Sequence, residues 1–231
     1  MKKSLFLGLL LAIVSIMATG CSSCQSGNKK QENASETKEC VKPDFFTQDY
    51  DGVIEAGLLK TERIISTDLE EMYLIADGRD YRWFETDILL TTPLNDEDCT
   101  CDVFSVTDVF QTITEKDGGY DTKVFMLTTT AKNHDVQVFP DAFYIENYPL
   151  NNEPLSISFQ QAFDLAMQAN IPKPNSRNCV LRKPVGPNRC NAQYIFGNLH
   201  EQIYVDAVTG AVSAENPAFF GYLGKPLGEW P

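Results

Sequence analysis

The chain has 231 residues and a formal net charge of −13 at pH 7, with 43% hydrophobic and 11% aromatic residues. This hydrophobic fraction is enough for a packed core, and the length suits one large domain or two small ones. The acidic balance argues against nucleic acid as a partner and against charge attraction to an anionic membrane, because both need a concentrated basic face.

The first element is a secretory leader. Two lysines precede an apolar run from Leu5 to Met17, which is shorter than the roughly 20 residues that cross a bilayer as a helix. Small residues and a cysteine follow, in Ala18-Thr19-Gly20-Cys21. This ending resembles the lipobox of bacterial lipoproteins, in which the cysteine is acylated and the leader is removed. We therefore expect a signal peptide at residues 1–20 and lipid on Cys21; the alternative is an ordinary signal peptide with an accidental cysteine.

Residues 21–42 contain almost nothing to bury and are expected to be a flexible tether. The lipobox resemblance implies a protein of the bacterial cell envelope, held to the bilayer by fatty-acyl chains such as palmitate on Cys21. Ser22 favours sorting to the outer membrane, by resemblance to enteric lipoproteins, with the folded part exposed to the periplasm.

Residues 43–150 are rich in β-branched and aromatic stretches separated by turn dipeptides such as Asp77-Gly78. The strongest hairpin signal is Asp117-Gly118-Gly119, which separates two strand-like runs. Short connections favour antiparallel pairing. We expect strands at residues 71–76, 81–90, 102–106, 109–114, 123–130, 136–139 and 143–145.

Residues 151–231 begin with the one confident helix of the mature chain. Ser158 and Gln161 have the spacing of a capping box, and apolar residues then recur at helical spacing until Pro172 prevents continuation. Strands are expected at 179–182, 192–196, 202–206 and 211–213. The aromatic tail, residues 219–231, either covers the core or forms an exposed docking strip. The predicted fold class is α+β: an antiparallel β-rich N-terminal region, then a helix with an antiparallel sheet. No internal repeat is evident.

The stretch from Ser158 to Ser213 resembles a PepSY domain. The resemblance depends on the helix with Gln161-Ala162 and Ala166, and on Ile203-Tyr204-Val205-Asp206-Ala207-Val208-Thr209-Gly210-Ala211-Val212. Asp206 is suited to accept hydrogen bonds from turn amides, and Gly210 to supply a positive φ. The resemblance implies a regulatory or binding module without catalytic residues.

The chain has seven cysteines, and six remain if Cys21 is acylated. An even number in an exported protein indicates disulfides, and the candidates are Cys24, Cys40, Cys99, Cys101, Cys179 and Cys190. A proline-containing turn lies between Cys179 and Cys190, so we expect these two to pair across a hairpin. Cys99 and Cys101 are spaced to face one side of a strand, which leaves open a redox-active or metal-binding pair.

The sequence contains no recognisable catalytic site. His134 and His200 lie in turn-like segments without a second histidine at metal spacing, so we expect no metal ligand, no cofactor and no catalytic residue. The acidic run around Asp96 lacks the pattern of a calcium loop and is expected to be solvated.

The function predicted from the sequence is therefore a non-enzymatic, lipid-anchored envelope protein that binds a protein partner of unknown identity. The alternative is an envelope redox or metal-handling protein that uses Cys99 and Cys101.

Overall fold

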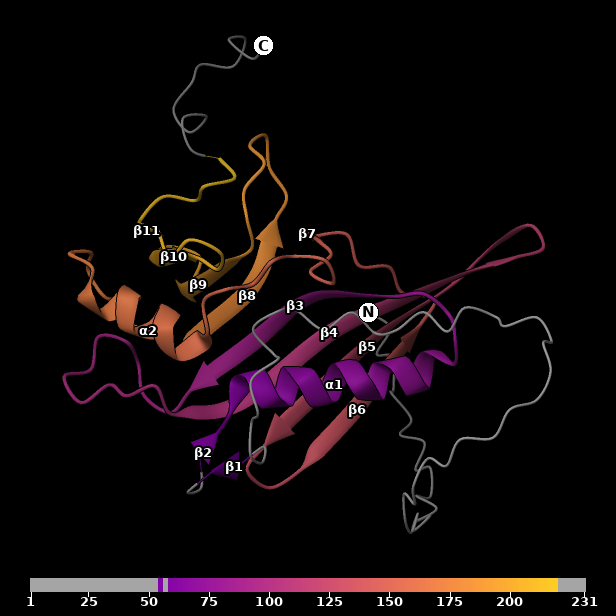
Figure 1. The fold of residues 1–231 in the computed structure, drawn as a ribbon, viewed down its shortest axis with the longest axis horizontal. Helices are drawn as coiled ribbons and strands as arrows, with labels where there is room; N and C mark the ends of the chain where they lie inside the picture. Colours follow the sequence, from indigo (N-terminus) through magenta and orange to yellow (C-terminus); the bar gives the residue numbers. More distant parts are fainter. Residues whose placement is uncertain (1–53, 56–57, 220–231) are drawn as a thin grey trace, which may run out of the picture. The chain divides into compact units, whose positions relative to one another are not determined.

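One antiparallel sheet organises the chain, as a computed structural model shows (Figure 1). The structure describes residues 54–55 and 58–219, so the predicted signal peptide, the tether with Cys21, Cys24 and Cys40, and all of the aromatic tail but Phe219 lie outside the described residues. The fold is mixed α and β with a dominant antiparallel sheet, as expected, but the described residues contain two helices where one was expected. The elements are β1 (Ile54–Glu55), β2 (Leu58–Leu59), α1 (Thr61–Ala76), β3 (Tyr81–Leu90), β4 (Val103–Lys116), β5 (Gly119–Thr130), β6 (His134–Pro140), β7 (Asn147–Tyr148), α2 (Phe159–Gln168), β8 (Asn178–Pro184), β9 (Gln193–Gly197), β10 (Gln202–Asp206) and β11 (Val212–Ser213).

The order of strands in the sheet is β11-β10-β9-β8-β3-β4-β5-β6, and β7 pairs with the end of β8. Strands β3 to β6 form one antiparallel meander and β8 to β11 form a second, each preceded by a helix. The two meanders join through β3 and β8, where Ile88 lies opposite Cys179. The sheet therefore crosses the expected boundary at residue 150, and the repeated order of a helix and four strands was not evident from the sequence.

Helix α1 corrects the largest error of the sequence interpretation, which expected a strand at residues 71–76. The buried residues Ile65, Leu69, Met72 and Ala76 recur every three or four positions, and the first three belong to the apolar core shared with the sheet. The helix ends at Asp77, whose φ of 50° is left-handed. The residues near position 74 have the composition of a strand. They are helical because burial of the apolar helix face against the sheet outweighs that local preference.

Helix α2 confirms the predicted capping box. The Ser158 hydroxyl accepts a hydrogen bond from the amide of Gln161 at 3.2 Å, and the Gln161 side chain accepts one from the amide of Ser158 at 2.8 Å. A carboxylate from the other helix adds to this cap, because Glu62 Oε1 accepts a hydrogen bond from the amide of Phe159 at 2.6 Å. Negative charge at a helix N-terminus is stabilising, so α1 helps to fix the start of α2.

Most of the predicted strands and turns are also confirmed. Gly118 has a φ of 86° in the turn between β4 and β5. After β10, Asp206 accepts hydrogen bonds from the amides of Val208 and Thr209 at 2.9 and 2.8 Å, and Gly210 has a φ of 74°. Residues 143–145, which are among the described residues, do not form the expected strand. The short strand β7 forms at Asn147–Tyr148 instead.

Both helices contribute to one buried cluster on one face of the sheet. Ile64 and Leu69 of α1, and Phe159 and Phe163 of α2, belong to the same apolar core, and Phe159 stacks on Phe196 with 6.0 Å between ring centroids. The opposite face carries the alternate side chains of each strand. Within the described residues, no helix combines the length and the apolar character needed to cross a membrane.

Candidate functional site

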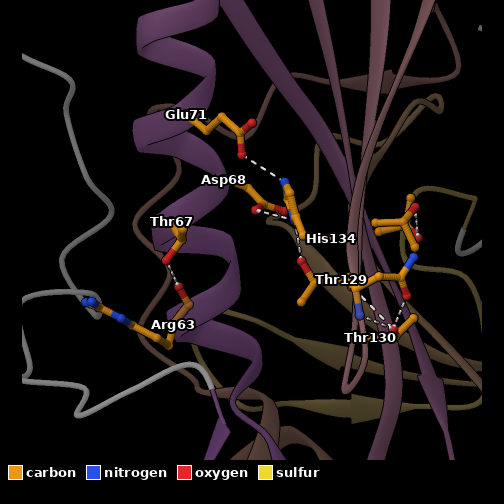
Figure 2. Close-up of polar contacts among 10 residues, drawn as sticks. Arg63, Thr67, Asp68, Glu71, Thr129, Thr130 and His134 are labelled. Atoms are coloured by element: carbon orange, nitrogen blue, oxygen red, sulfur yellow. Dashed lines mark hydrogen bonds and ion pairs between the residues drawn. The ribbon is translucent and has the colours of Figure 1, made fainter. Parts of the chain in front are cut away.

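A group of ionisable side chains interrupts the apolar contact between α1 and the sheet (Figure 2). Asp68 and Glu71 lie three residues apart on α1 and therefore on one face of the helix. His134 begins β6 and lies opposite Thr129 of β5. The ligand atoms of Asp68, Glu71 and His134 all lie within 4.8 Å of one another.

The His134 imidazole has a polar neighbour at each nitrogen (Figure 2). Its Nε2 atom lies 2.8 Å from Glu71 Oε2, and its Nδ1 atom lies 2.8 Å from the Thr129 hydroxyl oxygen. Asp68 Oδ1 is 3.9 Å from Nδ1. The ring is thus oriented from two sides, by a helix and by the neighbouring strand.

Asp68 is the most unusual member of the group. It is 1% exposed, and neither of its carboxylate oxygens has a hydrogen-bond partner within the described residues. Burial raises the pKa of Asp68, and the nearby carboxyl of Asp108 raises it further. Two ionised carboxylates buried side by side repel each other, so a proton on one of them or a nearby cation stabilises the pair.

Asp108 is held by the sheet itself. It is fully buried on β4, where it accepts a short hydrogen bond from Thr86 of the neighbouring strand β3. The indole of Trp83 donates in turn to the Thr86 hydroxyl at 3.2 Å. Burial raises the pKa of Asp108, while its hydrogen bonds lower it. This network fixes one carboxyl beneath Asp68 in a region otherwise filled by apolar side chains.

The group lines a small pocket of about 150 Å³ together with Ile64 and Thr67. A hydroxyl, an imidazole and a carboxylate follow one another here, which is the order of a catalytic triad. The hydroxyl belongs to Thr129, however, and Thr129 is only 8% exposed, so a substrate has little access to it. Two carboxylates and one imidazole can instead hold a cation or share protons.

The structure changes the interpretation of one histidine. His134 was expected to lie in a turn without partners, but it starts a strand and contacts residues more than 60 positions earlier. His200 is exposed in the connection between β9 and β10 and belongs to no such group among the described residues.

No disulfide joins Cys179 to Cys190 in the structure. Both are free thiols there, as are Cys99 and Cys101. The register of β8 and β9 places Phe196 opposite Cys179, whereas Cys190 lies in the connection beyond the paired residues. The turn between the two cysteines is therefore not symmetric about them.

Cys99 and Cys101 lie in the connection before β4 and pack against the core. Burial raises the pKa of Cys99, and it raises the pKa of Cys101 to about 12. A redox-active or metal-binding cysteine works as a thiolate, which a lowered pKa favours. The surroundings of Cys99 and Cys101 raise the pKa and therefore disfavour the thiolate.

A second feature lies on the face of the sheet opposite the helices. Side chains there alternate with the buried residues Ile88 and Val106, and they line a hollow of about 340 Å³. Its polar members come from three adjacent strands: Asp87, Ser105, Thr107 and Asn178. Burial raises the pKa of Asp87 to about 6, helped by the negative charge of Glu85 and opposed by Arg182.

Sequence reasoning missed the carboxyl groups at the helix–sheet interface, although each leaves a signal. Asp68 falls on the apolar face of α1, between Ile65 and Met72. Asp108 falls between Val106 and Phe110 on the buried side of β4. A polar residue at an apolar position is the informative observation in both cases, but the first is visible only once residues 61–76 are recognised as a helix.

The chain was compared with known proteins by sequence and by structure. No protein family, no curated protein and no solved structure matches it.

Proposed function

We propose that this chain is an exported, lipid-anchored protein of the bacterial cell envelope, and that its folded part binds a protein partner. The leader and Ala18-Thr19-Gly20-Cys21 support the anchor. Acyl chains on Cys21 would hold the protein at the membrane, since each buried CH₂ contributes about 0.8 kcal/mol. Ser22 supports the outer membrane as the destination.

The binding role is supported by the likeness of residues 158–213 to PepSY domains. The proposal assigns α2 and the strands β8 to β11 to a PepSY-like unit. In favour of it are the capped helix, the antiparallel strands that follow, and the turn built by Asp206 and Gly210. PepSY domains are regulatory or binding modules, so the likeness favours recognition of a protein over catalysis.

The single structural observation that favours a binding role is the hollow on the sheet face opposite the helices. Its hydroxyl and carboxyl residues are half-buried, its amide residue Asn178 is exposed, and all of them lie on the face away from the helices. Such groups give orientation and specificity to a bound partner. We propose this hollow as the binding surface.

Detergent-phase partitioning tests the anchor. Wild-type protein should enter the detergent phase and carry acyl groups on Cys21 in N-terminal mass spectra. Cys21→Ser should give an unprocessed or water-soluble protein. Wild-type protein that stays in the aqueous phase would contradict the lipid anchor.

A photo-crosslinking amino acid in place of Thr107 tests the binding surface in intact cells. The matched control carries the same group in place of Gln160, which is exposed on α2. We expect one discrete protein adduct from position 107 that is absent from position 160. Equal labelling from both positions, or none from position 107, would contradict the proposed surface.

A further inference from the structure

We propose that Asp68, Glu71 and His134 bind one divalent transition-metal ion, of which zinc is the reference occupant. The proposal concerns the helix-covered face of the sheet and is independent of the binding role proposed for the other face.

The donor set fits such an ion. Imidazole nitrogen suits zinc, copper, iron and nickel, while carboxylate oxygen is accepted by all of them. One nitrogen and two carboxylate oxygens within 4.8 Å of one another can contact a single ion. Three protein ligands also leave a position for water in the tetrahedral coordination of zinc. Nε2 of His134 and Oε2 of Glu71 are 2.8 Å apart, and a small outward movement of the partly exposed Glu71 side chain would admit an ion between them.

The Thr129 hydroxyl prepares the imidazole for this role. Metal-binding histidines commonly donate their second N–H group to an oxygen, which fixes the ring and its tautomer. The 2.8 Å contact between His134 Nδ1 and the Thr129 hydroxyl is of this kind in the tautomer that carries its proton on Nδ1. It leaves the lone pair of Nε2 directed to the side where Glu71 lies.

The surroundings of Asp68 support a bound ion independently of the donor set. Asp68 is only 1% exposed, and its carboxylate oxygens have no hydrogen-bond donor among the described residues. It lines the pocket beside His134. Three carboxyl groups, on Asp68, Glu71 and Asp108, meet one imidazole here. A divalent ion in this pocket gives Asp68 the partner that it lacks among the described residues. Unpaired charge in such a place is otherwise costly.

Isothermal titration of the mature, metal-stripped protein with zinc chloride tests the proposal. We expect one ion per chain for the wild type. His134→Gln and Asp68→Asn should each weaken binding at least about tenfold, and Thr129→Val by roughly tenfold to hundredfold through the loss of ring orientation. His200→Gln is the matched control and should bind as the wild type does. Calcium chloride should give no binding at this site, because calcium takes oxygen ligands.

Folding is checked by circular dichroism and urea unfolding of each metal-free variant. Asp68→Asn keeps the shape of the side chain, so an unchanged urea midpoint for this variant would assign its loss of zinc binding to the missing carboxylate ligand. The proposal is overturned if the wild type fails to bind zinc, or if His134→Gln and Asp68→Asn bind it as the wild type does. Calcium binding that displaces zinc would also overturn it.

Discussion

The two halves of the sheet are built alike but packed differently. Each half has one helix followed by four antiparallel strands, and both helices cover the same core. The buried residues of α2 are all apolar, whereas α1 buries Thr61, Glu62, Ser66 and Asp68 as well as apolar residues. The two helix–sheet interfaces are therefore different. The interface of α2 stabilises the fold through apolar contacts, whereas the interface of α1 also holds ionisable groups whose burial lowers the free energy of unfolding.

The largest expected effect concerns the apolar half. Phe159→Ala removes a ring that stacks on Phe196 and contacts Tyr194. Loss of a buried aromatic side chain costs about 3–5 kcal/mol. Urea unfolding should show this decrease in the free energy of unfolding. A loss below about 1 kcal/mol would mean that α2 is not the apolar support described here.

The charged half should respond in the opposite direction. In the metal-free protein, Asp68→Asn should raise the free energy of unfolding by about 1–3 kcal/mol, because it removes a buried carboxyl without hydrogen-bond donors. Urea unfolding with a chelator present measures it. A clear destabilisation would show that the Asp68 carboxyl contributes favourable contacts in the metal-free state.

The face of the sheet opposite the helices makes its own contribution to the pH dependence of stability. The pKa of Asp87, on the face opposite the helices, is raised from 3.8 to about 6, so its folded state favours the protonated form. Its contribution to stability is fully present below about pH 4 and is lost as the pH rises through about 6. A shift of this size corresponds to about 3 kcal/mol if fully expressed, and partial exposure should reduce it to ~1–2 kcal/mol.

Asp87→Asn isolates this contribution. Urea midpoints between pH 4 and pH 7 should fall less steeply for the variant than for the wild type, and the variant should be the more stable protein at pH 7. Parallel curves for the two proteins would contradict the raised pKa of Asp87.

The smallest effect concerns the start of α2. Ser158→Ala removes the hydroxyl that accepts a hydrogen bond from Gln161, and such a loss costs about 1 kcal/mol. Thermal unfolding should show a small decrease in stability with zinc binding unchanged. Altered zinc binding would indicate that the two helices are coupled, as the contact between Glu62 and the amide of Phe159 permits.

Local patterns allowed most of the fold to be predicted. The capping box at Ser158, the turn at Gly118 and the alternating residues of Tyr81–Leu90 each specify one element without distant contacts. Helix α1 was missed because the residues near Leu74 have the composition of a strand, and their helical state depends on packing against β3 and β4.

The candidate site could not be predicted in the same way. Glu71 and His134 lie 63 residues apart in the sequence and meet only because β6 follows β5 beneath α1. The residue opposite Cys179 could not be predicted for a related reason, since it is set by the register of β8 and β9 and not by the turn between them.

X-ray absorption at the zinc edge tests the central claim most directly, because it reports which atoms surround the ion. The wild-type protein loaded with one zinc should show only nitrogen and oxygen neighbours, at about 2.0–2.2 Å, with the signature of a single imidazole. Sulfur neighbours at about 2.3 Å would place the ion on cysteines and contradict the assignment to Asp68, Glu71 and His134.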